Sequence, residues 1–187
     1  PGWNGAERIT PAHRRAWSSI DPPTRRTDDR SHSPVRSEAL GVVPVSEELG
    51  ISQVVWSPIA QGVLTGKYRP GEQPPEGSRA TDDKGGADMI ARWMDDDVLT
   101  RVQELKPVAE EVGLSMAALA VAWVLQNDNV ATAIIGASRP EQVHDNAKAA
   151  GVQLPTEVLK RIDEILDPVI ERDPAKTLES SPKTREA

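Results

Sequence analysis

A small-residue loop with a single lysine follows the apolar stretch 51–56. Ser57, Gly62, Gly66 and Lys67 lie in it. Glycines leave backbone N–H groups accessible and let a ligand approach where a Cβ would block it. Together with the nearby ammonium, these are the groups that bind a phosphate or a pyrophosphate. An ordinary glycine-containing turn after a strand is the alternative interpretation of the same spacing.

A second anion-binding pattern follows the apolar stretch 130–135. Ser138 and Arg139 begin a helical pattern over 139–150, and Ser138 with Glu141 has the spacing of a capping box. An anion placed there would meet free N–H groups, the positive end of the helix dipole and a guanidinium. Simple helix capping is the bland interpretation, and it is compatible with the functional one.

Two strands are expected to deliver the chain to these loops. Ile51–Trp56 is short, β-branched and followed by a Ser-Pro pair, which predicts a buried strand, and Val130–Ile135 predicts a second. The segment 38–49 predicts a helix that ends at Gly50, so the chain enters the first strand from a helix, as in a wound α/β fold.

Further helices are predicted after each strand. The spacing of apolar residues predicts one or two amphipathic helices over 88–112 with a kink at Pro107, and a helix that begins at Ser115. The latter helix is apolar on nearly every side, so other elements must cover it. A last amphipathic helix is expected over 156–166, and the aspartates 95–97 are expected on a solvated helix face.

Composition excludes several classes of function. The chain has 187 residues, a net charge of −7 and no cysteine, so disulfides and thiolate chemistry are excluded. Its acidic balance argues against a nucleic-acid or anionic-membrane role. No apolar run approaches the ~20 residues of a membrane span, and a soluble cytoplasmic protein is expected. The three histidines have no ligand spacing, so no metal site is expected.

The amino-terminal segment 1–41 has a different character. Its portion 18–37 contains Ile20 and Val35 as its only large aliphatic residues, so it is expected to be disordered or loosely held. A compensated frameshift in the gene, a divergent linker and an arginine-rich nucleic-acid arm are three explanations. The arm is disfavoured because aspartates dilute the positive charge and no aromatics are interleaved.

Three ordered motifs carry a family resemblance. They are W-S-P-I-A-Q-G-V-L-T-G-K-Y at 56–68, G-S-R-A at 77–80 and I-I-G-A-S-R-P-E-Q-V-H-D-N at 134–146. Together they resemble the carboxyl half of an aldo-keto reductase, in the branch that includes the potassium-channel β subunits. The resemblance implies a (β/α)8 barrel that binds NADPH and reduces carbonyls.

The expected fold follows from this resemblance and from the chain length. A complete barrel takes ~250 residues, so the chain is expected to be α/β, an incomplete (β/α)8 TIM barrel formed from the carboxyl-terminal part. We expect an irregular segment over 1–41, the barrel part over 42–167 and a polar tail over 168–187.

The resemblance also implies a cofactor site. Arg79 would lie beside the pyrophosphate, Ser138 and Arg139 would bind the 2′-phosphate of NADPH, and Gln142 and Asn146 would reach the adenine. Asp145 stands where the family usually has a longer Glu. The full set of expected cofactor-binding residues is Trp56, Ser57, Pro58, Ile59, Ala60, Gly62, Lys67, Arg79, Gly136, Ser138, Arg139, Gln142, Asp145 and Asn146.

Catalytic residues are not expected in this chain. The family's tetrad of Asp, Tyr, Lys and His lies on the first four strands, and the only tyrosine here, Tyr68, matches a cofactor-loop position instead. The full-length family member would take a small carbonyl substrate, and this chain alone is expected to be inactive and to bind NADPH weakly or not at all. The alternative is a non-catalytic nucleotide-binding or regulatory module, or a non-functional fragment, and a complementary amino-terminal half is a possible partner.

Overall fold

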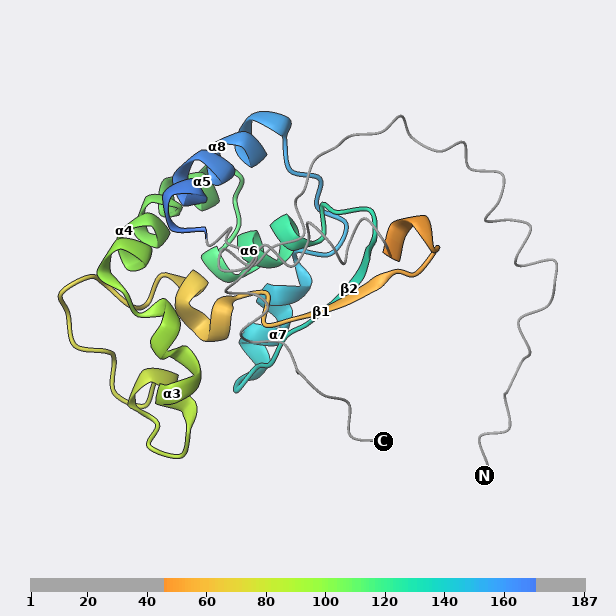
Figure 1. Ribbon diagram of the computed structural model, residues 1–187. Coiled ribbons are helices and arrows are strands. Elements are labelled where there is room, and N and C mark those ends of the chain that lie inside the picture. Colours follow the sequence, from red (N-terminus) through yellow and green to blue (C-terminus); the bar gives the residue numbers. More distant parts are fainter. Residues whose placement is uncertain (1–45, 171–187) are drawn as a thin grey trace, which may run out of the picture.

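Two parallel strands form the sheet of the computed structural model, which describes residues 46–170 (Figure 1). Strand β1 (Gln53–Trp56) pairs with β2 (Val130–Ile134), with Trp56 opposite Ile134. Because the strands are parallel, their carboxyl ends lie at the same edge of the sheet. The loops that follow the two strands therefore begin side by side.

Apart from the helical residues 46–48, the helices lie between and after the strands. In chain order they are η2 (Ala60–Thr65), η3 (Arg79–Thr81), α3 (Gly86–Ile90), η4 (Ala91–Trp93), α4 (Asp96–Glu104), α5 (Lys106–Glu111), α6 (Met116–Val124), α7 (Pro140–Ala147), α8 (Thr156–Leu166) and η5 (Asp167–Val169). The predicted last helix has the bounds of α8. The predicted helix over 139–150 is shorter, ending at Ala147.

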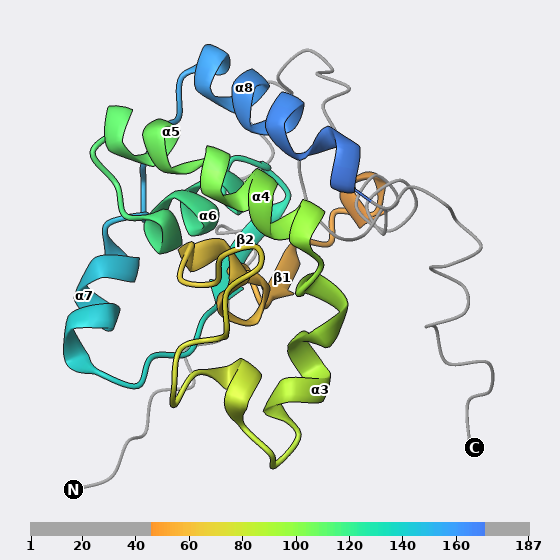
Figure 2. The ribbon, with the colours of Figure 1, turned by 90° about the vertical axis from the view of Figure 1, so that its left-hand side faces the viewer.

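Helix α6 is the centre of the core. Every residue from Ala118 to Val124 is buried, and the helix contacts β2, η2, α5 and α7. Figure 2 shows α4, α5 and α8 grouped on one side of α6 and the two strands on the other. The expectation that this all-apolar helix must be covered by other elements is confirmed. Its N-cap is Ser115, whose Oγ accepts a hydrogen bond from the N–H of Ala118 at 3.1 Å.

The prediction that β1 is buried is wrong for one face of the sheet. Val54 and Trp56 are 58% and 61% exposed, and Ile134, opposite Trp56, is 60% exposed. Alternate residues of a strand point to opposite faces, so these three side chains lie on the same face. The helices of the described part pack on the other face only, which leaves this apolar face uncovered.

The region 88–112 is divided more finely than the periodicity predicts. It forms α3, η4, α4 and α5, and the break between α4 and α5 lies at Leu105, two residues before Pro107. The aspartates 95–97 are exposed, as expected, and they lie at the start of α4. Asp95 is the N-cap of α4 and accepts from the N–H of Asp97 at 2.9 Å, while Asp96 accepts from the N–H of Gly71.

Three predicted segments lie partly or wholly outside the described residues. Residues 46–48 are helical and Gly50 has a φ of 68°, consistent with a helix that ends there. The remainder of that helix, the segment 1–41 and most of the tail lie outside the described residues.

No single helix among residues 46–170 is long and apolar enough to cross a membrane. One bent pair, Asp96–Glu111 with Met116–Val124, meets the length and composition criteria only when its two parts are joined across an 89° bend.

Candidate functional site

The segment 57–68, here called the first loop, has an unusual backbone. Ser57, Ala60 and Gln61 have φ angles of 56°, 47° and 57°, which residues other than glycine rarely adopt. Each such residue costs on the order of 1–3 kcal/mol and persists only where its surroundings hold it in place. The Gln61 amide donates to the Ser57 hydroxyl, and the Thr65 hydroxyl donates to the Gly62 carbonyl at 2.7 Å. Strain of this kind is concentrated at ligand-binding sites.

Lys67 lies over the turn that contains Gly62. A Cβ built at Gly62 would be 3.3 Å from the Lys67 Nζ, and that Nζ is 5.0 Å from the centre of the Tyr68 ring. Lys67 is exposed, whereas Tyr68 is 1% exposed and packs in the core. The ammonium therefore stands above a buried aromatic ring, beside the turn at Gly62, which carries no side chain of its own.

The segment 135–139, here called the second loop, leads into α7 in a different way from the prediction. The partner of Ser138 is Gln142, not Glu141. The Gln142 Oε1 accepts from the backbone N–H groups of Ser138 and Arg139, at 2.8 and 3.3 Å, and from the Ser138 hydroxyl at 3.2 Å. Arg139 is the N-cap, one residue later than expected. Two N–H groups that an anion was expected to meet are thus bonded to this side chain.

Asp145 is held by neighbours on two helices. Its carboxylate accepts from the hydroxyl of Ser115 and from the Lys148 ammonium at 3.1 Å. The hydrogen bond from Ser115 lowers the pKa of Asp145 below its ordinary value of 3.8, and Lys148 lowers that pKa further. The Ser115 hydroxyl therefore joins the start of α6 to α7.

A cavity of about 260 Å³ brings residues of the two loops together. Ile59 and Thr65 line it from the first loop, and Gly136 lines it from the second. The remaining wall comes from α6 and α7. Its members are Ala117, Glu141, Gln142, Asp145 and Asn146. Of the expected cofactor-binding residues, five therefore meet in one cavity.

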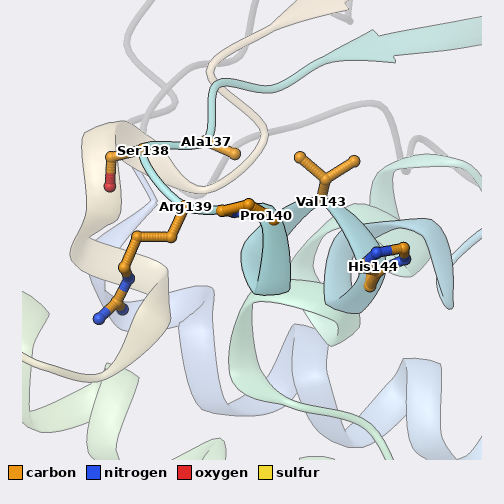
Figure 3. Close-up of a pocket in the computed structure, with 6 residues that line it drawn as sticks. All are labelled: Ala137, Ser138, Arg139, Pro140, Val143 and His144. Carbon is orange, nitrogen blue, oxygen red and sulfur yellow. The ribbon is translucent and has the colours of Figure 1, made fainter.

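Arg139 lines a second cavity, of about 460 Å³, at the start of α7. Figure 3 shows its six lining residues, with the Arg139 side chain pointing away from Val143 and His144. Ser138 lies at the same end of the helix as Arg139. His144 is exposed.

The other expected site residues are distributed around the first loop. Pro58, Ala60 and Gly62 are buried in the loop itself, and the Trp56 side chain lies on the exposed sheet face. Arg79 lies on η3, which contacts α3, and its guanidinium is 3.9 Å from the sulfur of Met89. Arg79 is exposed and is not among the residues that line either cavity.

Sequence reasoning missed three residues that support the site. Thr65 and Ala117 line the first cavity, and Gln103 of α4 donates to two carbonyls of the first loop. Ala117 carries no polar group that a pattern could single out. Gln103 has Thr100 and Lys106 as neighbours at helical spacing, so no local pattern in the sequence distinguished it.

The described residues offer no constellation for acid–base or metal chemistry. Within them, no group of three or more histidine, cysteine and acidic side chains could hold a metal ion. Tyr68 is buried, and its hydroxyl has no hydrogen-bond partner within the described residues. The two loops instead present one cation each, Lys67 in the first loop and Arg139 in the second.

Comparison with known proteins identifies the family. The aldo/keto reductase family matches residues 28–167, a range that begins within the segment predicted to be irregular. A probable voltage-gated potassium channel β subunit of Arabidopsis thaliana is 40% identical over 126 residues, which cover 66% of this chain and 38% of that relative. A putative β subunit from Schizosaccharomyces pombe is 40% identical over 129 residues, covering 67% and 37%.

A third relative and a solved structure agree. A probable β subunit from Oryza sativa subsp. japonica is 38% identical over 138 residues, 73% of this chain and 40% of the relative. A glycerol dehydrogenase from Gluconobacter oxydans superposes with a TM-score of 0.53 at 27% identity, over 69% of this chain and 38% of that one.

The chain thus spans about two fifths of the length of the proteins it matches. The family and this structure imply the (β/α)8 barrel fold. The chain belongs to the aldo/keto reductase family, in the branch that resembles the potassium-channel β subunits.

Proposed function

We propose that the two loops bind NADPH and that the chain is the cofactor-binding part of an oxidoreductase that reduces aldehydes or ketones. The observation that carries the proposal is the cavity lined by both loops, because Ile59 from one and Gly136 from the other face the same space. Family membership supports it, since the family match over residues 28–167 includes both loops.

The charges of the two cavities suggest how the cofactor lies. Glu141 and Asp145 line the first cavity, and their carboxylates would repel a phosphate there. Arg139 lines the second cavity without an acidic neighbour among its lining residues. We therefore assign the adenine to the first cavity, beside Asn146, and the 2′-phosphate to the second.

Binding of the 2′-phosphate requires a local change in this arrangement. The N–H groups of Ser138 and Arg139 are bonded to Gln142. Rotation of the Gln142 side chain would release both groups to the phosphate and move its amide towards the adenine. The pyrophosphate would lie along the first loop, where Lys67 supplies the cation.

Bound NADPH would supply the hydride for carbonyl reduction. The residues of this chain would hold the cofactor, and the proton donor would come from the family's tetrad, which the resemblance places outside this chain. The chain alone is therefore expected to show no reductase activity.

Titration of the purified chain with NADPH and NADH, followed by cofactor fluorescence, tests the proposal. We expect weak binding of NADPH, and Arg139→Ala should weaken it by about 10- to 100-fold while leaving NADH unchanged, because one charged hydrogen-bonding partner is lost. The control is Arg101→Ala, which removes an exposed guanidinium paired with Glu104. Equal losses for both cofactors would contradict the assignment of Arg139, and no binding at millimolar cofactor would contradict the proposal.

The second candidate function is that of a binding module. In this role the chain would associate with a separate polypeptide that supplies the other strands of the barrel. The exposed Val54, Trp56 and Ile134 favour it, because an apolar sheet face of this kind is normally covered. Sedimentation of the chain with the amino-terminal half of a related reductase tests it. We expect a one-to-one complex that Trp56→Asn weakens and that Met89→Asn, at an exposed site on α3, does not. Failure of the two pieces to associate would exclude this role.

A further inference from the structure

Gln103 joins α4 to the first loop on both sides of Lys67. Its Nε2 donates to the carbonyl of Tyr68 at 2.7 Å and to the carbonyl of Gly66 at 3.2 Å. These bonds connect residues 35 and 37 positions apart in the chain. The two carbonyls belong to the residues that flank Lys67, so the amide spans the backbone of the lysine.

This bridge restricts the Lys67 backbone. Gly66 has a φ of 71°, in the left-handed region that glycine adopts without a steric penalty, so the Gly66 residue itself does little to fix the chain direction at Lys67. Rotation of the peptide units around Lys67 would break one or both bonds from Gln103. Because both acceptors are half-buried backbone carbonyls, losing the donor would also leave them without this partner.

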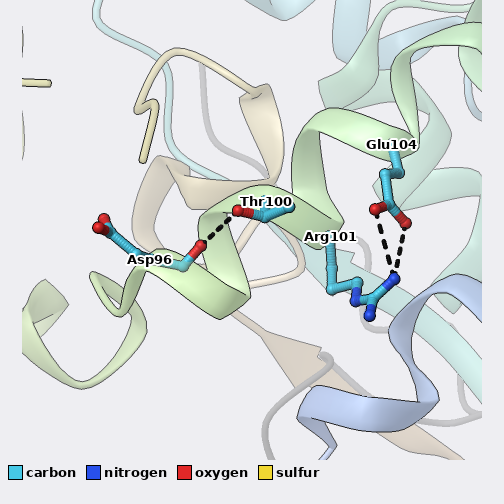
Figure 4. A network of polar contacts seen from close by, with 4 residues as sticks. All are labelled: Asp96, Thr100, Arg101 and Glu104. Atoms are coloured by element: carbon cyan, nitrogen blue, oxygen red, sulfur yellow. Dashed lines mark hydrogen bonds and ion pairs between the residues drawn. The ribbon is translucent and has the colours of Figure 1, made fainter. Parts of the chain in front are cut away.

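The bridge comes from a rigid element. On α4, Leu99 and Val102 are 2% and 0% exposed, and Asp95 caps the start of the helix. Figure 4 shows the polar side chains of the same helix, where Arg101 pairs with Glu104 and the Thr100 hydroxyl donates to the Asp96 carbonyl. A donor placed on a packed helix is more precise than one carried by the loop itself.

We propose that Gln103 is a positioning residue that holds Lys67 in the orientation in which its ammonium meets the diphosphate of the cofactor. The proposal rests on the proposed function, because it assigns the diphosphate to Lys67. Gln103 itself does not touch the ligand; it acts by fixing the two peptide groups next to the lysine.

Gln126 provides a matched control. Its Nε2 donates to the carbonyls of Ala122 and Val152 at 2.8 and 2.9 Å, and its Oε1 accepts from the N–H of Leu154 at 3.0 Å. It therefore joins a helix to a distant segment as Gln103 does, and it lines neither cavity. Gln126→Leu should lower stability at least as much as Gln103→Leu without affecting the lysine.

The first measurement is amide hydrogen exchange of the full chain without ligand. In Gln103→Leu the amides of residues 62–69 should exchange about tenfold faster, the change expected when local opening loses about one net hydrogen bond. In Gln126→Leu these amides should match wild type. Gln103→Lys keeps a donor that can reach one carbonyl at a time, so it should restore part of the protection. Wild-type exchange in Gln103→Leu would overturn the proposal.

The second measurement is affinity for three probes: NADPH, inorganic pyrophosphate and 2′-AMP. Gln103→Leu should weaken the two diphosphate-containing probes by about threefold to tenfold, consistent with a less well-oriented ammonium, and leave 2′-AMP unchanged. A uniform loss for all three probes would show a merely structural role and overturn the proposal. If wild type binds none of the three probes, the proposed function fails. Faster amide exchange confined to Gln103→Leu would in that case still support the proposal that Gln103 restrains the backbone around Lys67.

Discussion

The first and second loops begin at neighbouring strand ends but are built differently. In the first, Ala60 is 1% exposed and three non-glycine residues have positive φ. The second is exposed from Gly136 to Arg139, and its polar contacts come from Gln142 of the helix that follows. One loop is thus held by the core, and the other is held by its own helix.

This difference separates two ways of binding the ends of one ligand. A loop with a fixed backbone presents N–H groups and an ammonium with little reorganisation, so it suits the part of a ligand that never varies. In the second loop the backbone N–H groups are bonded to one side chain, Gln142, and an anion can replace that side chain as their acceptor. We infer that the first loop fits a diphosphate, and that discrimination between cofactors belongs to the second.

The largest expected effect is at Gly62. It has a φ of 104°, and a side chain there would also meet Lys67. Gly62→Val should lower the free energy of unfolding by about 2–3 kcal/mol, because a β-branched residue is strained in this conformation. Urea denaturation measures the change.

Gly136 in the second loop is the control for Gly62. No atom lies within 4 Å of a Cβ built there, and its φ is not in the left-handed region. Gly136→Val should change stability by less than about 0.5 kcal/mol. Equal costs at the two glycines would show that the loops do not differ in rigidity.

A smaller effect is expected at the contact that holds α7. Ser115→Ala removes the N-cap of α6 and the hydrogen bond to Asp145. The loss should be about 1 kcal/mol at neutral pH, as for other N-caps. Thr100→Ala, which removes a side-chain bond within α4, is the control and should be nearly neutral.

The same variant has a pH dependence with a definite sign. The folded state lowers the pKa of Asp145 below 3.8, so the carboxylate contributes stability above that pH and loses it as the pH falls through the folded value. Wild type should therefore lose more stability than Ser115→Ala on acidification below 3.8. An NMR titration of the Asp145 carboxyl should show its pKa rising in Ser115→Ala, and an unchanged pKa would contradict the contact.

The smallest effect is expected at Lys148. Its ammonium pairs with Asp145 at 3.1 Å but is 64% exposed. Lys148→Gln should lower stability by less than about 0.5 kcal/mol, and salt should reduce the difference further. Thermal unfolding at low and high salt measures it. A loss as large as that of Ser115→Ala would mean that the second loop depends on charge rather than on the hydroxyl bond.

Local patterns were sufficient to predict much of this molecule. The N-cap at Ser115, the bounds of α8 and the two strands follow from residue types within a few positions of one another. The placement of both loops at one sheet edge follows as well, since parallel strands end on the same side. Of the residues that the family resemblance implies for the cofactor, five line the shared cavity, whereas Thr65 and Ala117 of the same cavity were not predicted.

Contacts between distant segments decided the rest. The sequence could not show that Gln142 rather than Glu141 caps α7, because both side chains can reach back and only the observed loop path favours one. Nor could it show that Gln103 reaches the first loop. That bond forms only because α4 packs against the loop, although Gln103 and Tyr68 are 35 residues apart in the sequence. The exposure of Val54 and Trp56 could not be predicted either, because an apolar run of this length is typical of a buried strand, and only the surrounding elements decide whether both faces are covered. Short-range chemistry specifies caps, turns and strands, whereas the partner of each polar side chain depends on which elements the core brings together.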